Sequence, residues 1–368
     1  MSGKTLSEIR DAIDAVDQEL QRLINERAAL AKAVAEIKLA EAAKTGAAPV
    51  FYRPEREAQV LERVMARNSG PLPNAEVGRL FREIMSSCLA LEQPLAVGYL
   101  GPIGTFTELA TLKHFGHAVV ARPLTTIADV FREVEAETIE YGVVPIENST
   151  EGMVTHTLEC FSESLVVICG EVEMRIHQAL MGRSGTALSD VTEVYSHQQS
   201  LSQCRQWLDA NVPHAARHTA SSNAEAARLV ANAPESVVWA AVGGERAADA
   251  YGLEVLANRI EDQPDNTTRF LVIGRQRTDP SGHDKTSIIV SLKNQPGALY
   301  RLLEPFDRRG IDMTRLESRP SHSGVWTYRF FIDFIGHQDE PHIHAFLDEL
   351  RGQAMEFKVL GSYPKAML

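Results

Sequence analysis

The earliest residues whose spacing suggests chemistry are two cations on a long amphipathic segment. Residues 5–39 carry apolar side chains at alternating steps of three and four, which is the spacing of one face of an α-helix. Arg27 occupies a position on this face, and Lys38 lies about 20° around the helix from it. Because an unpaired charge within a packed surface is costly, we expect both cations to face a bound anion. We call the apolar positions of this face the apolar stripe; they are Leu6, Ile9, Ile13, Val16, Leu20, Leu23, Leu30, Val34 and Ile37.

The length of this segment predicts a dimer. A straight helix of about 35 residues is roughly 50 Å long, which is more than a compact block of 92 residues can cover alone. Arg10 precedes Arg27 by 17 residues, or roughly 26 Å along the axis. One small ligand can therefore touch both arginines only if two chains are intertwined in an antiparallel dimer.

Residues 1–93 resemble the all-helical chorismate mutase family. The resemblance rests on Arg10, Glu26-Arg27, Ile37-Lys38-Leu39, Arg56-Glu57, Cys88 and Glu92. It implies that Arg27 and Arg56 bind the two carboxylates of chorismate, with Arg10 supplied by the partner chain. Glu57 would bind the ring hydroxyl, and Lys38 the ether oxygen. An exposed basic helix face is the plain alternative, but Arg27 interrupts an otherwise apolar stripe.

The implied reaction fits these residue types, because a Claisen rearrangement needs no nucleophile or proton shuttle. Catalysis then consists of holding a compact conformer and stabilising charge on the ether oxygen. An ether oxygen only accepts hydrogen bonds, so Glu92 can contact it only when protonated. We expect mutase activity to fall as the pH rises through the titration of Glu92, unless Glu92 is simply a solvated residue at a helix end. Arg53 stands where relatives can have an acidic residue, so the hydroxyl contact rests on Glu57.

Residues 95–275 contain four short motifs at predicted strand ends. They are Gly101-Pro-Ile-Gly104-Thr105, Gly142-Val-Val-Pro-Ile-Glu147-Asn148-Ser149, Tyr195-Ser196-His197-Gln198-Gln199 leading to Gln203-Cys204, and Asn266-Thr267-Thr268-Arg269-Phe270. Each alone suits a turn or a helix cap, and a glycine turn before a helix can bind an anion. The first is not the dinucleotide pattern GxGxxG, so we do not expect NAD. In this order the four motifs resemble prephenate dehydratase.

That resemblance implies two lobes around a cleft, like a periplasmic binding protein, with the chain crossing between lobes near 173 and 265. Thr268 would be the essential hydroxyl, and Arg269 and Phe270 would complete its motif. The substrate contacts would be Asn148, Ser196 and Gln203, with Thr105 and Glu147 as neighbours.

The dehydratase reaction expels a ring hydroxyl together with CO2, and it needs a proton donor. Threonine is a very weak acid, so we expect Thr268 to orient and polarise the hydroxyl. Glu147, with a pKa raised by burial, would supply the proton. His197 is an alternative acid, and a structural role for it is equally open.

Residues 285–364 resemble the phenylalanine-binding form of the ACT regulatory domain. The run Thr286–Leu292 leads through Asn294 and Pro296 into a helix beginning near Gly297. The resemblance implies an effector site at a contact between domains, with the backbone near Asn294 meeting the charged ends of the amino acid. Its other residues would be Gly297, Ala298, Leu299, Glu317, Ser318, Arg319 and Pro320. A dimerisation module that binds nothing is the alternative.

The elements that carry these residues form three blocks. Helical patterns near 54–68 and 74–92 follow the long helix, and no strand is evident before residue 93. Strands at 95–100, 142–146, 165–172, 192–196, 237–242 and 269–274 alternate with helices, which predicts α/β with mainly parallel sheets. A polar linker at 276–284 precedes a strand–helix–strand–strand–helix–strand order, the ferredoxin-like α+β arrangement.

Composition narrows the class of protein. A net charge of −12 argues against a general nucleic-acid binder. The four cysteines lack CxxC pairing and metal-ligand spacing, so we expect reduced thiols, no metal and no cofactor. No signal peptide and no stretch of eighteen apolar residues is evident, which predicts a cytoplasmic chain without membrane contact.

Together the blocks predict a bifunctional enzyme of phenylalanine biosynthesis. The first would make prephenate from chorismate, the second would make phenylpyruvate from prephenate, and phenylalanine would inhibit through the third. A non-catalytic phenylalanine sensor and a dehydratase acting mainly on arogenate are the alternatives. The chain would form a homodimer or higher homo-oligomer. The sequence leaves open dimer against tetramer, channelling of prephenate, and inhibition of the mutase.

Overall fold

The computed structural model describes residues 5–46, 48–293, 295–320 and 328–367 of the 368-residue chain. Two compact units are present, and each is described separately. The first consists of the described residues of Met1–Arg53 together with Val60–Leu95 and Phe115–Val120, and the second contains the remainder. None of the helices in these described residues is both long and apolar enough to cross a membrane.

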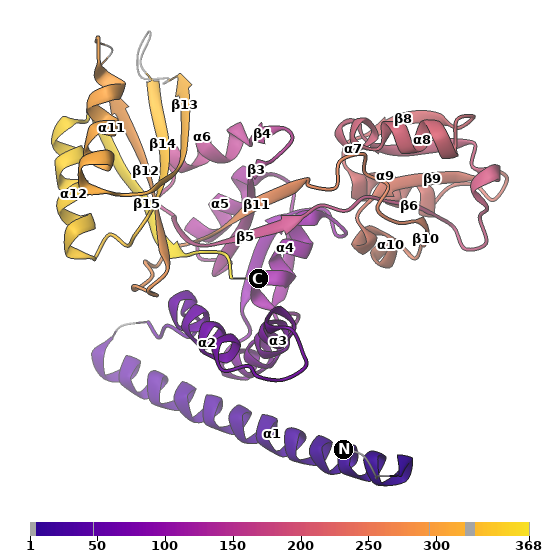
Figure 1. Cartoon of the computed structure of the whole chain (residues 1–368), viewed down its shortest axis with the longest axis horizontal. Coiled ribbons are helices and arrows are strands. Elements are labelled where there is room, and N and C mark those ends of the chain that lie inside the picture. The colour runs from indigo at the N-terminus through magenta and orange to yellow at the C-terminus, as the bar shows by residue number, and fades with distance from the viewer. Residues whose placement is uncertain (1–4, 47, 294, 321–327, 368) are drawn as a thin grey trace. The chain divides into compact units, whose positions relative to one another are not determined.

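The first unit is helical. Its main elements are α1 (Leu6–Thr45), most of α2 (Pro54–Ala66) and α3 (Asn74–Glu92), with α1 contacting α3 (Figure 1). A capping box between Thr5 and Glu8 begins α1. The helix continues beyond the predicted end at residue 39, because the first left-handed residue is Gly46, with φ of 72°. The apolar stripe is exposed along the whole of α1.

The second unit begins with a six-stranded sheet. The strand order is β2 (Val120–Leu124), β1 (Ala96–Leu100), β3 (Tyr141–Asn148), β11 (Thr267–Gly274) and β5 (Val167–Arg175), with β4 (Gly152–Met153) paired to β3. The helices that follow its strands are α4 (Phe106–Phe115), α5 (Ile127–Glu135) and α6 (Thr155–Glu163). The last strand in sequence, β11, lies between β3 and β5 in the centre of the sheet.

A second, five-stranded sheet is inserted between β5 and β11. Its order is β10 (Glu254–Ala257), β6 (Ala179–Gly182), β9 (Trp239–Gly243), β7 (Glu193–His197) and β8 (Ala216–Ala220). The helical segments of this sheet are η1 (Leu188–Asp190), α7 (Gln198–Gln203), α8 (Arg205–Asn211), α9 (Asn223–Ala231) and α10 (Glu245–Tyr251). The chain passes from one sheet to the other at residues 176–178 and returns at 258–266.

Both sheets are mixed, which corrects the expectation of mainly parallel sheets. The pairs β1–β3, β7–β8 and β7–β9 are parallel, whereas β3–β11, β5–β11, β6–β9 and β6–β10 are antiparallel. The antiparallel pairs involve the strands that carry the chain between the sheets. These strands reach their neighbours without the helical crossover that a parallel pair requires.

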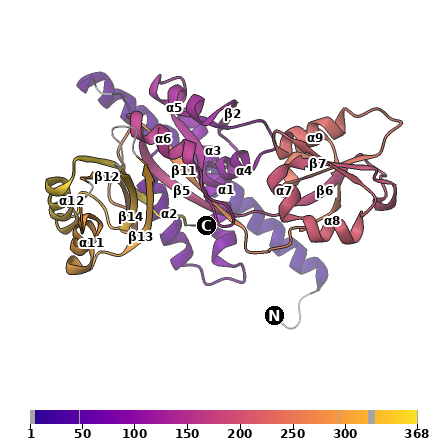
Figure 2. The same cartoon turned by 90° about the horizontal axis from the view of Figure 1, so that it is seen from above.

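The carboxyl-terminal block is a four-stranded antiparallel sheet with two helices. The sheet order is β13 (Met313–Pro320), β14 (Tyr328–Ile335), β12 (Asp284–Leu292) and β15 (Glu356–Pro364). The helices α11 (Ala298–Arg309) and α12 (Pro341–Gln353) cover one face of this sheet (Figures 1 and 2). Ile288, Val290 and Phe334 belong to the core between the sheet and the helices.

The other face of this sheet packs against the six-stranded sheet. Ile289 and Phe331 share a buried cluster with Ile146 and Leu271 of β3 and β11. At Gly361 of β15 a Cβ atom would collide with the backbone of Ile168 on β5, so the two chain segments approach closely. The predicted polar linker is also packed: Thr278 is only 4% exposed, and its carbonyl lies 3.0 Å from Nε2 of His337.

Candidate active sites

In the helical unit the structure brings Lys38 to the end of α3. Its Nζ donates a hydrogen bond to the carbonyl of Phe51 at 3.2 Å and lies 3.8 Å from Oε2 of Glu92. Arg27 is half-buried, and its charge also acts on Glu92. These three residues therefore form a local site from α1 and α3, with two cations beside one carboxyl group.

The environment of Glu92 raises the pKa of its carboxyl group above the ordinary value. Its side chain is only 11% exposed, and burial raises its pKa even though Lys38 and Arg27 oppose the shift. Oε2 of Glu92 is buried and lacks a hydrogen-bond partner among the described residues. A buried carboxyl oxygen without a partner is available to a ligand.

A second site is a cleft in the larger unit, with a volume of about 490 Å³. Its walls come from both sheets and from the segments that cross between them. The lining residues used below are Thr105, Asn148, Glu151, Gln178, His197, Gln203, Asn223, Asn266, Thr268 and Phe270.

Thr268 and Asn148 form the centre of a hydrogen-bonded row in this cleft. They are a cross-strand pair on β11 and β3, and Nδ2 of Asn148 donates to Oγ1 of Thr268 at 2.8 Å. The same amide donates to Oδ1 of Asn266 at 2.7 Å. Because Oγ1 of Thr268 accepts from Asn148, its own hydroxyl hydrogen can be donated to a ligand.

The row continues to a carboxyl group. Nδ2 of Asn266 donates to Oε1 of Gln203 at 3.1 Å, and Nε2 of Gln203 donates to Oε1 of Glu151 at 3.3 Å. Burial raises the pKa of Glu151, although His197 partly offsets the shift. Glu151 and His197 are the titratable side chains among the described lining residues.

Two helix starts contribute to the lining of the cleft. The first residues of α4 and α9, around Thr105 and Asn223, line it, and free N–H groups at a helix start attract anions. Gln178 is 1% exposed, and its Oε1 has no hydrogen-bond partner in the described part of the chain. Within that part, the lining includes no Arg or Lys. An anionic ligand would therefore be held by dipoles rather than by full charges.

Comparison with known proteins gives three consecutive family matches. Family models match residues 9–93 as chorismate mutase type II, residues 97–278 as prephenate dehydratase, and residues 286–344 as an ACT domain. A bifunctional chorismate mutase/prephenate dehydratase from Pseudomonas aeruginosa is 57% identical over 363 residues, covering 99% of this chain and 98% of the relative. The chain belongs to this bifunctional family.

Two further comparisons agree with this assignment. The corresponding protein of Neisseria gonorrhoeae is 49% identical over 359 residues, which cover 98% of this chain and 97% of the relative. The solved structure of prephenate dehydratase from Arthrobacter aurescens, in complex with L-Phe, is 34% identical with a TM-score of 0.69. That match covers 74% of this chain and 90% of the solved chain.

In the dehydratase cleft the structure assembles some of the expected residues and leaves others outside. Thr105, Asn148, Gln203, Thr268 and Phe270 line it. Ser196 does not. It is fully buried, and its Oγ lies 2.9 Å from Oδ1 of Asn223 and donates to the carbonyl of Val242 at 2.7 Å. Ser196 therefore positions Asn223, which does line the cleft.

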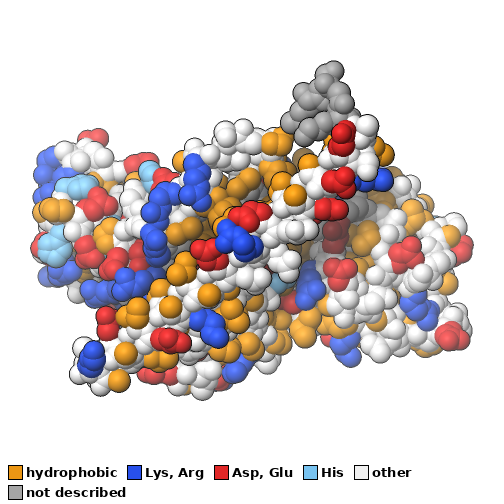
Figure 3. Space-filling model, turned by 90° about the horizontal axis from the view of Figure 1, so that it is seen from below, with side chains coloured by type: hydrophobic (Ala, Val, Ile, Leu, Met, Phe, Trp, Pro, Cys, Tyr) orange, Lys and Arg blue, Asp and Glu red, His pale blue; other side chains and the backbone are white. Residues whose placement is uncertain are grey.

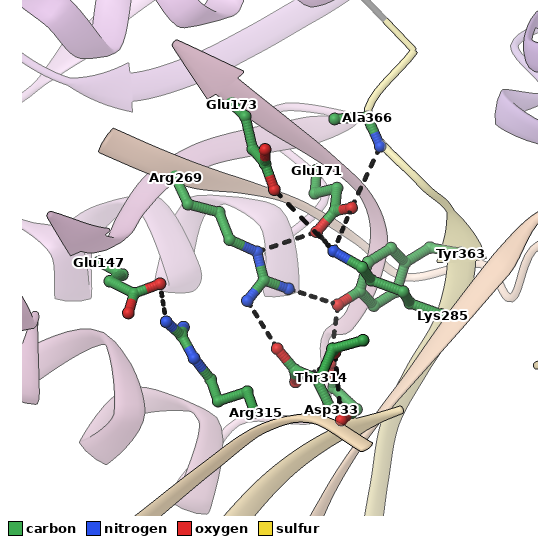
Figure 4. Close-up of polar contacts among 11 residues, drawn as sticks. Glu147, Glu171, Glu173, Arg269, Lys285, Thr314, Arg315, Asp333, Tyr363 and Ala366 are labelled. Atoms are coloured by element: carbon green, nitrogen blue, oxygen red, sulfur yellow. Dashed lines mark hydrogen bonds and ion pairs between the residues drawn. The ribbon is translucent and has the colours of Figure 1, made fainter. Parts of the chain in front are cut away.

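Glu147 and Arg269 are also not among the lining residues of the cleft, so the roles expected for them there stay predictions. Residues alternate between the two faces of a strand, so Asn148 and Thr268 face the cleft while Glu147 and Arg269 face the ACT sheet. Arg269 bonds to Glu171, and Glu147 forms an ion pair with Arg315 (Figure 4). In this placement the Glu147 carboxylate is paired with Arg315 and lies away from the cleft lining.

The other residues expected in the mutase site lie on all three amino-terminal helices. Cys88 is buried on α3, one turn before Glu92. Arg10 is exposed near the start of α1, 17 residues before Arg27. Arg56 and Glu57 stand in the first turn of α2, in Pro54–Gln59, a segment that belongs to the other unit. The predicted roles of these residues remain predictions.

The expected effector residues lie on two segments of the ACT block. Gly297, with φ of 76°, precedes α11, which begins with Ala298 and Leu299. Glu317, Ser318, Arg319 and Pro320 end β13, and Glu317 pairs with Arg319 at 3.1 Å. Asn294 lies outside the described residues.

Sequence reasoning missed several cleft residues. Glu151, Gln178, Asn223 and Asn266 come from four different segments, and only the fold brings them together. Asn266 had a signal in the sequence, since it begins the motif that contains Thr268, two residues before it. Asn223 follows Ser222, whose side chain caps α9. A capped helix start beside an anion site is a pattern that could have identified it.

Proposed function

We infer that this chain is a bifunctional enzyme that converts chorismate to prephenate and prephenate to phenylpyruvate, with feedback inhibition by phenylalanine. The observation that carries this inference is the whole-length likeness to bifunctional relatives, together with a cleft centred on Thr268. The cleft has the hydroxyl and amide donors that a dehydration requires. It also has no Arg or Lys among its described lining residues.

For the dehydratase, we assign Thr268 as the donor to the departing hydroxyl. Asn148 donates to its Oγ1, so the hydroxyl hydrogen of Thr268 can be donated to the departing oxygen. In the reaction the bond to the carboxylate carbon breaks, CO2 leaves, and its electron pair enters the ring. The carbon–oxygen bond on the opposite side of the ring breaks, and the oxygen takes a proton and leaves as water.

Glu151 fits the role of the proton source. Its pKa is raised by burial and it lines the cleft, so it would have to protonate the departing oxygen directly. A raised pKa keeps more of the acid protonated near neutral pH. His197 is the other titratable lining residue and remains the alternative donor.

The absence of a cation from the described lining suits decarboxylation. An Arg beside the leaving carboxylate would stabilise the reactant more than the neutral product CO2, and so would slow the reaction. Helix starts around Thr105 and Asn223 bind carboxylate oxygens with partial charges. They can therefore orient prephenate without holding its leaving group too strongly.

For the mutase, we assign Arg27 and Arg56 to the carboxylates of chorismate and Glu57 to its hydroxyl. Lys38 and protonated Glu92 would stabilise the ether oxygen, and their placement at the same end of α1 and α3 supports this role. Cys88 would line the site. Arg10 would come from a second chain, because it is far from Arg27 along one straight helix.

A second copy of this chain is the partner that fits the apolar stripe. The nine apolar residues of the stripe are between 42% and 65% exposed. Figure 3 shows hydrophobic side chains exposed among charged ones on the surface seen from below. A long exposed apolar surface is typical of an interface. An intertwined helical dimer would cover the stripe, and the whole enzyme would be a dimer or larger homo-oligomer.

We also propose the finer architecture of the blocks and their boundaries. The mutase domain would be residues 1–93, the two-lobed dehydratase domain 95–275, and the ACT domain 285–364. The dehydratase lobes would resemble a periplasmic binding protein, and the ACT order β–α–β–β–α–β is that of a ferredoxin-like fold. All four cysteines are free, which suits the reducing cytoplasm.

The first experiment follows chorismate, prephenate and phenylpyruvate over time with the purified full-length chain. Phenylalanine is absent in one series and present in another. Phenylpyruvate formation that phenylalanine suppresses would establish both activities and the regulation. Prephenate that accumulates without phenylpyruvate would favour a sensor role for the central block. Faster turnover of arogenate than of prephenate would change the substrate of the dehydratase.

A further inference from the structure

The strands that carry the cleft residues also carry charged residues on their opposite face. Thr268 is followed by Arg269 on β11, and Asn148 is preceded by Glu147 on β3. Arg269 and Glu147 are opposite each other in the ladder, as are Thr268 and Asn148. A shift of either strand would therefore move a cleft residue and a charged residue together.

A second cross-strand pair faces them from the ACT sheet. Arg315 on β13 is opposite Asp333 on β14. The two pairs bond crosswise: Nη1 of Arg269 lies 2.6 Å from Oδ2 of Asp333, and Arg315 pairs with Glu147 (Figure 4). We call these four residues the clamp. It joins each cleft strand to a different strand of the ACT sheet.

Each nitrogen of the Arg269 guanidinium group has a hydrogen-bond partner. Its Nε donates to Glu171 at 2.9 Å and its Nη2 donates to Tyr363 at 2.9 Å, in addition to the bond to Asp333. The Arg269 side chain is 9% exposed. A second cation, Lys285, lies 2.8 Å from Oε1 of Glu171. The two cations balance the carboxylates of Glu171 and Asp333, so the buried group is neutral and well bonded.

The guanidinium group of Arg315 is less completely hydrogen-bonded than that of Arg269. Nη1 of Arg315 is buried and has no hydrogen-bond partner among the described residues. The charges of Asp333 and Glu317 also act on Arg315. A buried donor without a partner destabilises one arrangement relative to another that satisfies it. Asp333 is opposite Arg315 in the sheet and Glu317 is two residues along the same strand, so carboxylates other than Glu147 neighbour Arg315, as a contact with two arrangements requires.

The effector segment lies on the same strand as Arg315. Only Leu316 separates Arg315 from Glu317, the first residue of the proposed effector segment Glu317–Pro320. We propose that the clamp residues Glu147, Arg269, Arg315 and Asp333 are positioning residues that link the effector-binding strand β13 to Asn148 and Thr268 in the cleft. This inference rests on the proposed function. Phenylalanine would change the position of β13, and the clamp would transmit that change to the catalytic strands.

The test compares Glu147→Gln, Arg315→Gln and the double variant with the wild-type chain. For each, the dehydratase rate is measured without and with saturating phenylalanine, and phenylalanine binding is measured by calorimetry. The rate ratio is the dehydratase rate without phenylalanine divided by the rate with it. This ratio does not depend on how much protein is folded, so a purely structural role would leave it unchanged. Mutase activity in the same sample, without phenylalanine, reports on the integrity of the chain.

We expect the rate ratio to fall by about 5-fold or more in each single variant, since coupling between sites is typically of that size or larger. The double variant should show no further loss, because the two residues act as one contact. The charge-exchanged variant Glu147→Arg/Arg315→Glu should regain part of the ratio. The matched control is Arg308→Gln, which removes an exposed ion pair with Glu349 between α11 and α12 and should keep the wild-type ratio.

If Arg315→Gln does not fold, Arg315→Lys keeps the charge but loses the planar fork, and it should give an intermediate ratio. Wild-type rate ratios in all clamp variants would contradict the proposed coupling role of the clamp. It would also be contradicted if the losses in the two single variants multiplied in the double variant. A wild-type chain without dehydratase activity would instead contradict the proposed function.

Discussion

The side-chain amide of Asn148 donates a hydrogen bond to the hydroxyl oxygen of Thr268, 2.8 Å away across the β3–β11 pair. This bond fixes the direction of both groups. The oxygen of Thr268 is occupied as an acceptor, so the threonine can act on a substrate mainly as a donor. A hydroxyl that donates to a departing oxygen stabilises the charge that develops there.

Thr268→Ser should therefore retain much of the dehydratase activity, whereas Thr268→Val should lose it. The valine keeps the shape but not the donor, and removal of one such donor lowers kcat by about 100- to 1,000-fold. Steady-state kinetics with prephenate would measure the change, and mutase activity would confirm that the chain is folded. Equal dehydratase activity in Thr268→Val and wild type would remove the hydroxyl from the mechanism.

Glu151→Gln should lower the dehydratase kcat by about 100-fold or more, which is the usual size of general acid catalysis. The protonated form is the active one, and burial raises the pKa of Glu151 above its ordinary value. Wild-type kcat should thus decline as the pH rises through that pKa, and Glu151→Gln should lack this decline. The pH–rate profile from acid to neutral pH tests both points.

Two further variants test which residue supplies the proton. Glu147→Gln should keep the decline with pH, because Glu147 pairs with Arg315 of the ACT sheet and is not among the lining residues of the cleft. If instead His197→Asn removed the decline and Glu151→Gln preserved it, His197 would be the acid.

The order of domains was predictable because each motif is a continuous stretch of sequence. The chorismate mutase, prephenate dehydratase and ACT matches occur in the predicted order. The α3 helix occupies the predicted residues 74–92, since its apolar pattern ends at a clear boundary. Strands β2 and β8 were missed because they are mostly exposed and lack an apolar run. Edge strands commonly have this character.

The faces of the strands were harder to predict. A motif read as one unit suggests that Glu147 and Asn148 act together, and likewise Thr268 and Arg269. The period of two along a strand sends such neighbours to opposite faces. Which face meets the substrate depends on the packing of the ACT sheet against β3 and β11. No local sequence pattern predicts that packing.

The mutase should show its own dependence on pH. Burial raises the pKa of Glu92, and only the protonated group can donate to the ether oxygen. Mutase kcat/KM should therefore be highest below that pKa and fall as the pH rises through it. Glu92→Gln carries a permanent donor of similar size, so its profile should be flat over the same range. The same steep decline in Glu92→Gln would show that another group titrates.

The apolar stripe should be required for the mutase through dimerisation. Leu20 is 52% exposed at the middle of the stripe, and Leu20→Glu would place a charge inside the interface of two long helices. We expect this variant to sediment as a smaller species and to lose mutase activity, because Arg10 would no longer reach the site of a partner chain. Thermal unfolding and dehydratase activity would show whether the larger unit remains folded.

The matched control is Gln18→Glu, which adds the same charge on the opposite face of α1, at about 160° from Leu20. It should leave both the sedimentation coefficient and the mutase rate at wild-type values. Mutase activity that survives in Leu20→Glu at concentrations where the chain sediments as a monomer would contradict a shared active site. The role of Arg10 would then have to be found within a single chain, where α1 places it roughly 26 Å from Arg27.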